Sequence, residues 1–224
     1  QRTRKIMVDY TWSFSSLKQY QNCPKQYHEI RVLKNYTVKE NEAMIYGKEV
    51  HTALENYVRD GVELVKNYQK FKGMVDELIA IPGEKLCELE MALTRDKKPC
   101  AFDDENRWVR GIADLVIIDE DYAFVVDYKT GSNKYPDTKQ LKLMALMLFE
   151  HFPKVNKVKA GLMFLAKDSF ITAQYKRADM EKHWGTFNKI LTRLDASYEY
   201  DNWRPNPTPL CGWCSVKTCE FQRI

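Results

Sequence analysis

Residues 125–131 read Val-Val-Asp-Tyr-Lys-Thr-Gly, a strand-like pattern that carries two charged side chains. Side chains alternate between the two faces of a β-strand, so Asp127 and Lys129 project from the same face. The Thr-Gly pair that follows them is a strand breaker. The segment therefore predicts a strand whose end presents a carboxylate and an ammonium group side by side.

The preceding strand is expected at 108–119, and a polar turn pairs it antiparallel with the strand at 123–129. Asp114 interrupts its apolar run, and a carboxylate is costly to bury unless it is paired or bound to a metal. Two interpretations are open. Either Asp114 and Lys129 form a structural ion pair and Asp127 is solvated, or the two aspartates share a divalent cation such as Mg²⁺ or Mn²⁺.

The rest of the chain alternates helical and strand patterns. Helices are expected after a cap at Ser13 or Ser15, from Pro24, over 42–59, over 62–71, over 137–152 and over 178–198, and further strands at 86–94, 158–165 and 170–175. This order predicts a mixed α/β fold. We expect a single domain, 1–224, made of an extension (1–12), a helical region (13–85), a core (86–176), a C-terminal helix (177–204) and a Cys-rich tail (205–224).

Composition excludes several classes of protein. With 224 residues, 44% of them hydrophobic, the chain can bury a core and is not a disordered tail. No run of eighteen apolar residues predicts a membrane span, and the charged start does not resemble a secretory signal. We therefore expect a cytoplasmic protein of a prokaryotic or virus-infected cell. The net charge of +4 permits a nucleic-acid partner without requiring one.

Three of the six cysteines, Cys211, Cys214 and Cys219, lie together after three prolines, which argue against a helix there. Clustered cysteines in a reducing compartment are more often metal ligands than disulfides. Three thiolates leave a tetrahedral site or a cluster one ligand short, and Cys23 is the best candidate for the fourth. A loop of free thiols is the alternative.

The order of these motifs resembles the PD-(D/E)XK nucleases of the RecB type. Asp114 and then Asp127-x-Lys129 resemble the nuclease core, and residues 47–51, Gly-Lys-Glu-Val-His, resemble the helical Gly-x-x-x-His metal ligand. Gln140 matches the start of the Gln-x-x-x-Tyr motif.

The cysteines add to this resemblance. One cysteine before the core and three after it are similar to the iron–sulfur nucleases, which include AddB-type repair subunits and CRISPR-associated adaptation nucleases. Two positions depart from the family pattern, since Ala113 replaces a proline and Met144 stands at the tyrosine of Gln-x-x-x-Tyr.

The resemblance implies a restriction-endonuclease-like core, with a central mixed β-sheet flanked by helices and with the N-terminal helices tied to the Cys-rich tail. It also implies site residues. The catalytic residues would be Asp114, Asp127 and Lys129. The ligands of Mg²⁺ or Mn²⁺ would be His51, Asp114, Asp127 and the backbone carbonyl of Tyr128. A 4Fe-4S cluster, or Zn²⁺, would be held by Cys23, Cys211, Cys214 and Cys219, and DNA would be contacted by Gln140. Glu90 is either a further carboxylate of the site or a solvent-facing residue.

The function implied is that of a metal-dependent DNA exonuclease of repair or recombination. It would act on single-stranded DNA or duplex ends, with a helicase or recombination protein as partner. A catalytically silent or zinc-stapled DNA-binding module of the same fold is the alternative, although the presence of both aspartates and Lys129 favours an active enzyme.

Overall fold

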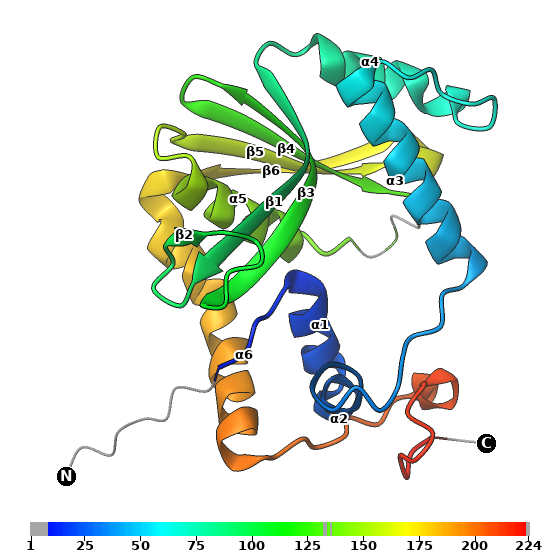
Figure 1. Ribbon diagram of the computed structural model, residues 1–224, viewed down its shortest axis with the longest axis vertical. Coiled ribbons are helices and arrows are strands. Elements are labelled where there is room, and N and C mark those ends of the chain that lie inside the picture. Colours follow the sequence, from blue (N-terminus) through cyan, green and yellow to red (C-terminus); the bar gives the residue numbers. More distant parts are fainter. Residues whose placement is uncertain (1–8, 132–133, 135, 223–224) are drawn as a thin grey trace. The chain divides into compact units, whose positions relative to one another are not determined.

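The computed structural model describes residues 9–131, 134 and 136–222, which form two compact units (Figure 1). The sheet unit spans Glu40–His183. The helical unit combines the described residues up to Lys39 with those from Trp184 onward. Most of the expected N-terminal extension, 1–12, lies outside the described residues.

The sheet unit is built on six strands in the order β2-β1-β3-β4-β5-β6 (Figure 1). Their bounds are β1 Glu84–Thr94, β2 Pro99–Cys100, β3 Arg107–Asp119, β4 Tyr122–Lys129, β5 Lys157–Phe164 and β6 Ser169–Lys176. The β4–β5 pair is parallel and every other pair is antiparallel. A parallel pair needs a crossover, which α5 (Lys139–His151) supplies. The predicted mixed α/β fold and its antiparallel β3–β4 pair are confirmed.

Helix α3 (Glu42–Asp60) packs against β1 and β3. The side chain of Asn41 caps its start, and Gly61, with φ of 68°, ends it in the left-handed conformation that glycine adopts most easily. Val50 and Leu54 from this helix are buried with Leu115 and other apolar residues of the sheet. This core fixes one face of α3 against the sheet and so fixes the direction of its remaining side chains.

The predicted helix over 62–71 is wrong. Val62 and Val65 are 55% and 61% exposed, and the chain turns after Gly61. Leu64 and Phe71 are buried instead. Helix resumes with the 3-10 turn η2 (Gln69–Phe71) and α4 (Lys72–Ala80). Further 3-10 turns, η3 (Leu165–Lys167) and η4 (Arg177–Asp179), flank β6.

The helical unit contains α1 (Phe14–Asn22), α2 (Pro24–Tyr27), the π-helical turn η1 (His28–Val32), most of α6 (Met180–Tyr200) and η5 (Pro209–Trp213). The predicted cap of α1 is present, because Ser13 accepts a bond from the Ser16 N–H. Tyr20, at 2% exposure, bonds to the Ser197 hydroxyl at 2.7 Å. The N-terminal helices are thereby joined to α6.

The N-terminal helices are also tied to the Cys-rich tail, as predicted. Lys25 forms an ion pair with Glu220 at 2.7 Å, and the Asn206 side chain donates to the Asn22 carbonyl at 2.9 Å. The expectation of an entirely non-helical tail is wrong, since η5 spans Pro209–Trp213. Proline is accepted at the first position of a helical turn because its missing N–H would have no partner there.

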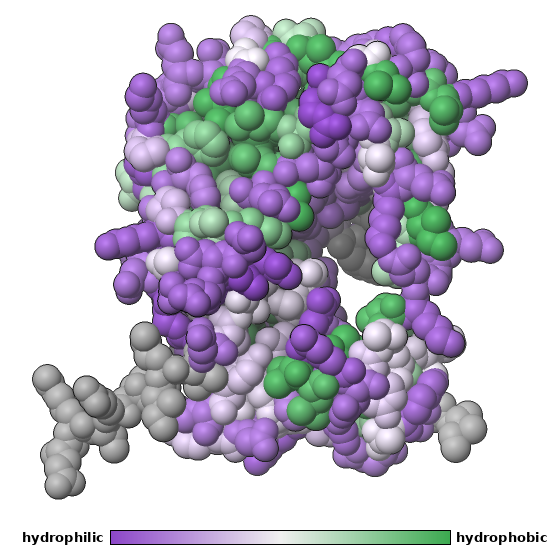
Figure 2. Space-filling model, viewed as in Figure 1, coloured by the Kyte–Doolittle hydropathy of each residue, from purple (hydrophilic) through white to green (hydrophobic). Residues whose placement is uncertain are grey.

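The described surface is mostly hydrophilic in the view of Figure 2, with separate apolar patches. Large exposed apolar side chains include Met44 and Ile45 of α3 and Leu210 and Trp213 of η5. No helix among the described residues has the length and apolar character needed to cross a membrane.

Candidate active site

Three side chains meet at the end of β4. Lys129 Nζ lies 2.5 Å from Asp127 Oδ2 and donates to Gln140 Oε1 at 3.1 Å. The amide nitrogen of Gln140, from the first turn of α5, donates to Asp127 Oδ1 at 2.5 Å. Asp127 is only 6% exposed. The expectation that Asp127 and Lys129 share a face fits this contact, whereas the alternative of an Asp114–Lys129 ion pair with a solvated Asp127 is wrong.

A second group lies beside the first. His51 of α3 is 3.0 Å from the Tyr128 carbonyl oxygen through Nε2 and 3.4 Å from Asp114 Oδ1 through Nδ1. The other Asp114 oxygen, Oδ2, accepts the Tyr128 N–H at 2.6 Å. The structure therefore brings His51, Asp114 and the Tyr128 carbonyl together, whereas the carboxylate of Asp127, the fourth predicted ligand, contacts Lys129 and Gln140. Gly47 lies one turn before His51, where an added Cβ would come within 3.3 Å of the Thr130 hydroxyl.

The β-ladders explain why Asp114 is available. The recorded pairing of β3 with β4 begins at Leu115 opposite Val126, so Asp114 lies just beyond it. Its carboxylate accepts the N–H of Tyr128 instead. On the other side of β3, Cys87 pairs with Leu115 and Leu89 with Ala113. Glu88 therefore faces Asp114 across a gap in that ladder.

Glu88 is the site residue that the sequence reasoning missed. Ligand atoms of His51, Glu88 and Asp114 all lie within 4.8 Å of one another. Glu90, the carboxylate considered from the sequence, is exposed. Both belong to Glu-Leu-Glu at 88–90, so strand alternation places them alike. The available signal was this pair of carboxylates on one face, but it does not say which of them lies opposite Asp114.

The site is strongly charged and partly dry, which shifts the pKa of several groups. Burial, followed by the charge of Asp114, raises the pKa of Asp127, and Lys129 only partly opposes this. Burial and the charges of Asp114 and Glu55 raise the pKa of Glu88 to about 7. For His51, burial lowers the pKa, but the hydrogen bond and charge of Asp114 outweigh it and the net shift is upward. Excess negative charge therefore surrounds this histidine.

The donor set suits a divalent cation. An imidazole nitrogen, carboxylate oxygens and a backbone carbonyl are the ligands that Mn²⁺ accepts, and Mg²⁺ takes the oxygens. The site offers them from α3, β1, β3 and β4. The residues present therefore fit the metal that the sequence implied.

The four predicted cluster cysteines all belong to the helical unit. N–H groups point at three of their sulfurs. Asn206 and Gln26 donate backbone N–H groups to Cys23 at 3.5 Å, the Gln26 amide donates to Cys214 at 3.5 Å, and Thr208 N–H donates to Cys211 at 3.3 Å. Within the part of the chain that the structure describes, no three of these sulfurs lie within 4.8 Å of one another.

Residues 11–219 match the model of the PD-(D/E)XK nuclease superfamily. The chain belongs to this superfamily. The match covers both the carboxylate site and the cysteine tail, and it accords with the six-stranded mixed sheet.

Solved structures share the fold of this PD-(D/E)XK chain. A Eubacterium rectale protein described as a "putative exonuclease" is 11% identical, with a TM-score of 0.57 over 96% of this chain and 90% of that one. The protein SSO0001 is 14% identical, with a TM-score of 0.51 over 99% of this chain and 91% of that one. No curated protein matches the sequence.

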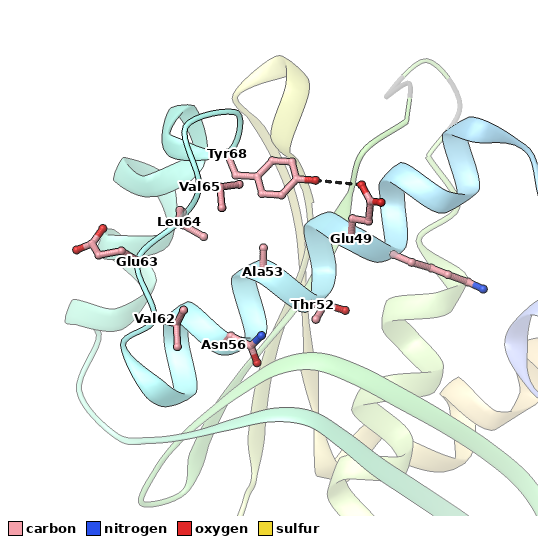
Figure 3. Close-up of a pocket in the computed structure, with 10 residues that line it drawn as sticks. Glu49, Thr52, Ala53, Asn56, Val62, Glu63, Leu64, Val65 and Tyr68 are labelled. Carbon is pink, nitrogen blue, oxygen red and sulfur yellow. Dashed lines mark hydrogen bonds between the residues drawn. The ribbon is translucent and has the colours of Figure 1, made fainter.

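Two features of this PD-(D/E)XK chain lie apart from the carboxylates. Met144 is 4% exposed and faces Gly111 of β3, so it is a packing residue in this structure. A hollow on the sheet unit lies between α3 and the segment 62–68 (Figure 3). The Tyr68 hydroxyl crosses part of it to reach Glu49 at 3.2 Å. None of the predicted site residues lines this hollow.

Proposed function

We propose that this protein is a metal-dependent DNA exonuclease that hydrolyses phosphodiester bonds. The observation that carries the proposal is that Lys129 and Asp127, at the end of β4, lie beside the His51–Asp114 pair, in which Asp114 belongs to the middle of β3. Superfamily membership supports nuclease chemistry. The Eubacterium rectale protein described as a "putative exonuclease" shares the fold, and that description is our reason for proposing an exonuclease.

Each residue has a defined task in this proposal. Mg²⁺ or Mn²⁺ at His51, Asp114, Asp127 and the Tyr128 carbonyl would lower the pKa of a bound water and stabilise charge on the phosphoryl oxygen. Lys129 donates hydrogen bonds from Nζ, either to the attacking water or to the phosphate oxygens that gain negative charge. Preorganised donors of this kind cost no reorganisation during the reaction.

Gln140 was predicted to contact DNA, and this remains a prediction. Its amide already holds Asp127 and Lys129, so its contact with DNA would have to coexist with these bonds or replace them. Asp127 and Gln140 together restrict Lys129 to one position, which supports a role of the ammonium group in catalysis.

End-labelled single-stranded and duplex DNA, incubated with Mg²⁺ or Mn²⁺, tests the activity. Wild type should release nucleotides from the label-bearing end, and Asp127→Ala should not. Circular DNA and end-labelled RNA distinguish an exonuclease from an endonuclease and DNA from RNA. Metal-dependent cleavage that is equal in wild type and Asp127→Ala would show that the activity does not come from this site.

We also propose that Cys23, Cys211, Cys214 and Cys219 hold a 4Fe-4S cluster that stabilises the helical unit. Hydrogen bonds from N–H groups stabilise thiolates and tune iron–sulfur clusters, and three of these sulfurs receive them.

Iron, sulfide and zinc measured on anaerobically purified protein test the cluster. We expect about four iron and four sulfide per chain, with loss of both in Cys211→Ser. Cys100→Ser is the matched control, because Cys100 belongs to the sheet unit. Zinc without sulfide would replace the cluster by a zinc site.

A further inference from the structure

Glu88 has an unusual backbone for a strand residue. Its φ is 47°, in the left-handed region that residues other than glycine seldom adopt. Glu88 lies within β1, where its neighbours Cys87 and Leu89 pair with β3 but Glu88 and Asp114 do not pair with each other. Such conformations cost free energy and persist where the surrounding structure maintains them, often at functional sites. This conformation directs a half-buried carboxylate to the neighbourhood of Asp114 and His51.

The Glu88 carboxylate lacks a direct polar partner among the residues that the structure describes. None of them donates a hydrogen bond to it or forms a salt bridge with it. One of its oxygens lies within 4.8 Å of an Asp114 oxygen and of a ring nitrogen of His51. Two carboxylates this close repel each other, and partial burial removes the water that would screen them. A cation bound between them would offset this repulsion.

Asp127 differs from Glu88 in this respect. One of its oxygens accepts the Gln140 amide and the other contacts the Lys129 ammonium group. Each carboxylate oxygen can accept more than one bond, so these contacts leave Asp127 able to ligate a metal. Glu88 differs because no hydrogen bond or salt bridge from the described residues offsets its charge.

We propose that Glu88 is a further ligand of the divalent cation that His51 and Asp114 would hold, in addition to the ligands named above. One imidazole nitrogen and two carboxylates, from α3, β1 and β3, form a mixed set that Mn²⁺ accepts more readily than Mg²⁺, which prefers oxygen ligands. The cation class is thus Mn²⁺-like. The inference rests on the proposed nuclease function for its purpose, but its test is a binding measurement that needs no DNA.

The experiment is titration of Mn²⁺ into metal-free protein, followed by calorimetry and by the electron paramagnetic resonance signal of free Mn²⁺. Glu88→Gln keeps the shape of the side chain and removes the charge. Loss of an outer-shell partner costs about 10- to 100-fold in metal affinity, so loss of this ligand should weaken Mn²⁺ binding about tenfold or more.

Glu90→Gln is the matched control, because Glu90 lies two residues along the same strand and is exposed. It should bind Mn²⁺ within about twofold of wild type, because Glu90 is not among the grouped ligand residues. Thermal melting in EDTA checks that each variant folds. If Glu88→Gln does not fold, Glu88→Ala tests the same ligand.

A Glu88→Gln variant that binds Mn²⁺ as tightly as wild type would overturn the inference alone. The metal would then be held by His51, Asp114 and Asp127 without Glu88, and the proposed nuclease would stand. Wild-type protein that binds no Mn²⁺ at millimolar concentration would overturn this site and the metal dependence of the proposed function together.

Discussion

Glu88→Gln should stabilise the metal-free protein at high pH and not at low pH. Burial and the charges of Asp114 and Glu55 raise the pKa of Glu88 from 4.5 to about 7. Between these values the folded protein binds more protons at Glu88 than the unfolded chain does. The contribution of Glu88 to stability is therefore most favourable below pH 4.5, becomes less favourable as the pH rises from 4.5 to about 7, and is constant above that. Glutamine resembles the protonated acid at every pH, so the variant avoids this loss.

The size of the effect follows from the pKa. A rise from 4.5 to about 7 corresponds to about 3 kcal/mol at pH 8, because each pKa unit is worth about 1.36 kcal/mol. Glu88 is only half-buried, so solvent screening reduces this to about 1–2 kcal/mol. For a chain of this length that is a rise in Tm of about 2–8 °C at pH 8.

The assay is thermal and urea unfolding of wild type, Glu88→Gln and Glu90→Gln in EDTA, at pH 5 and pH 8. We expect Glu88→Gln to exceed wild type at pH 8 and to match it closely at pH 5, and Glu90→Gln to match it at both. A variant less stable than wild type at pH 8 would refute the charge-repulsion argument. An equal gain at both pH values would attribute the effect to packing rather than to ionisation.

Three further outcomes are expected. Lys129→Ala should slow DNA cleavage about 10²- to 10⁴-fold in the end-label assay while Tm stays near that of wild type, and a loss of less than about tenfold would remove Lys129 from the catalytic group. Cys23→Ser should lose iron and melt at a lower temperature, whereas Cys87→Ser should keep its iron, because, of these two residues, it is Cys23 that contacts the segment of the tail. Equal iron in both variants would exclude Cys23 as a ligand. Burial lowers the pKa of His151 despite its hydrogen bond to the Ala92 carbonyl. The free energy of unfolding should therefore decrease as the pH drops below about 6.5, and it should decrease less in His151→Gln. Urea unfolding at several pH values measures both changes.

Much of the fold could be predicted because its signals are local. The alternation along 125–131 and the polar turn before it fix the β3–β4 pair and the common face of Asp127 and Lys129. The Ser13 and Gly61 caps act through their immediate neighbours, so they too can be read from the sequence. His51 was reached only through resemblance, since nothing in its own helix indicates that it faces Asp114.

The errors have physical causes. Val62 and Val65 have helical spacing, but Gly61 turns the chain and Leu64 supplies the buried contact instead. Proline breaks the interior of a helix, so the prolines predicted a tail without helix. Pro209 nevertheless begins η5, because the N–H that proline lacks would have no partner at the first position of a helical turn. In each case a tertiary contact or an end position overrode a rule that holds for the interior of a helix.

Glu88 shows a different limit. Regular strand alternation treats Glu88 and Glu90 as equivalent, and only the register with β3 separates them, which depends on the long connection between the two strands. The left-handed φ of Glu88 is a further local departure that no propensity predicts for glutamate. The left-handed backbone of Glu88 costs free energy, and the repulsion between the Glu88 and Asp114 carboxylates costs more in the metal-free protein. Both costs become understandable if the backbone is built to hold a carboxylate ready for a cation, and this is why one substitution should raise the stability of the metal-free protein while lowering its affinity for Mn²⁺.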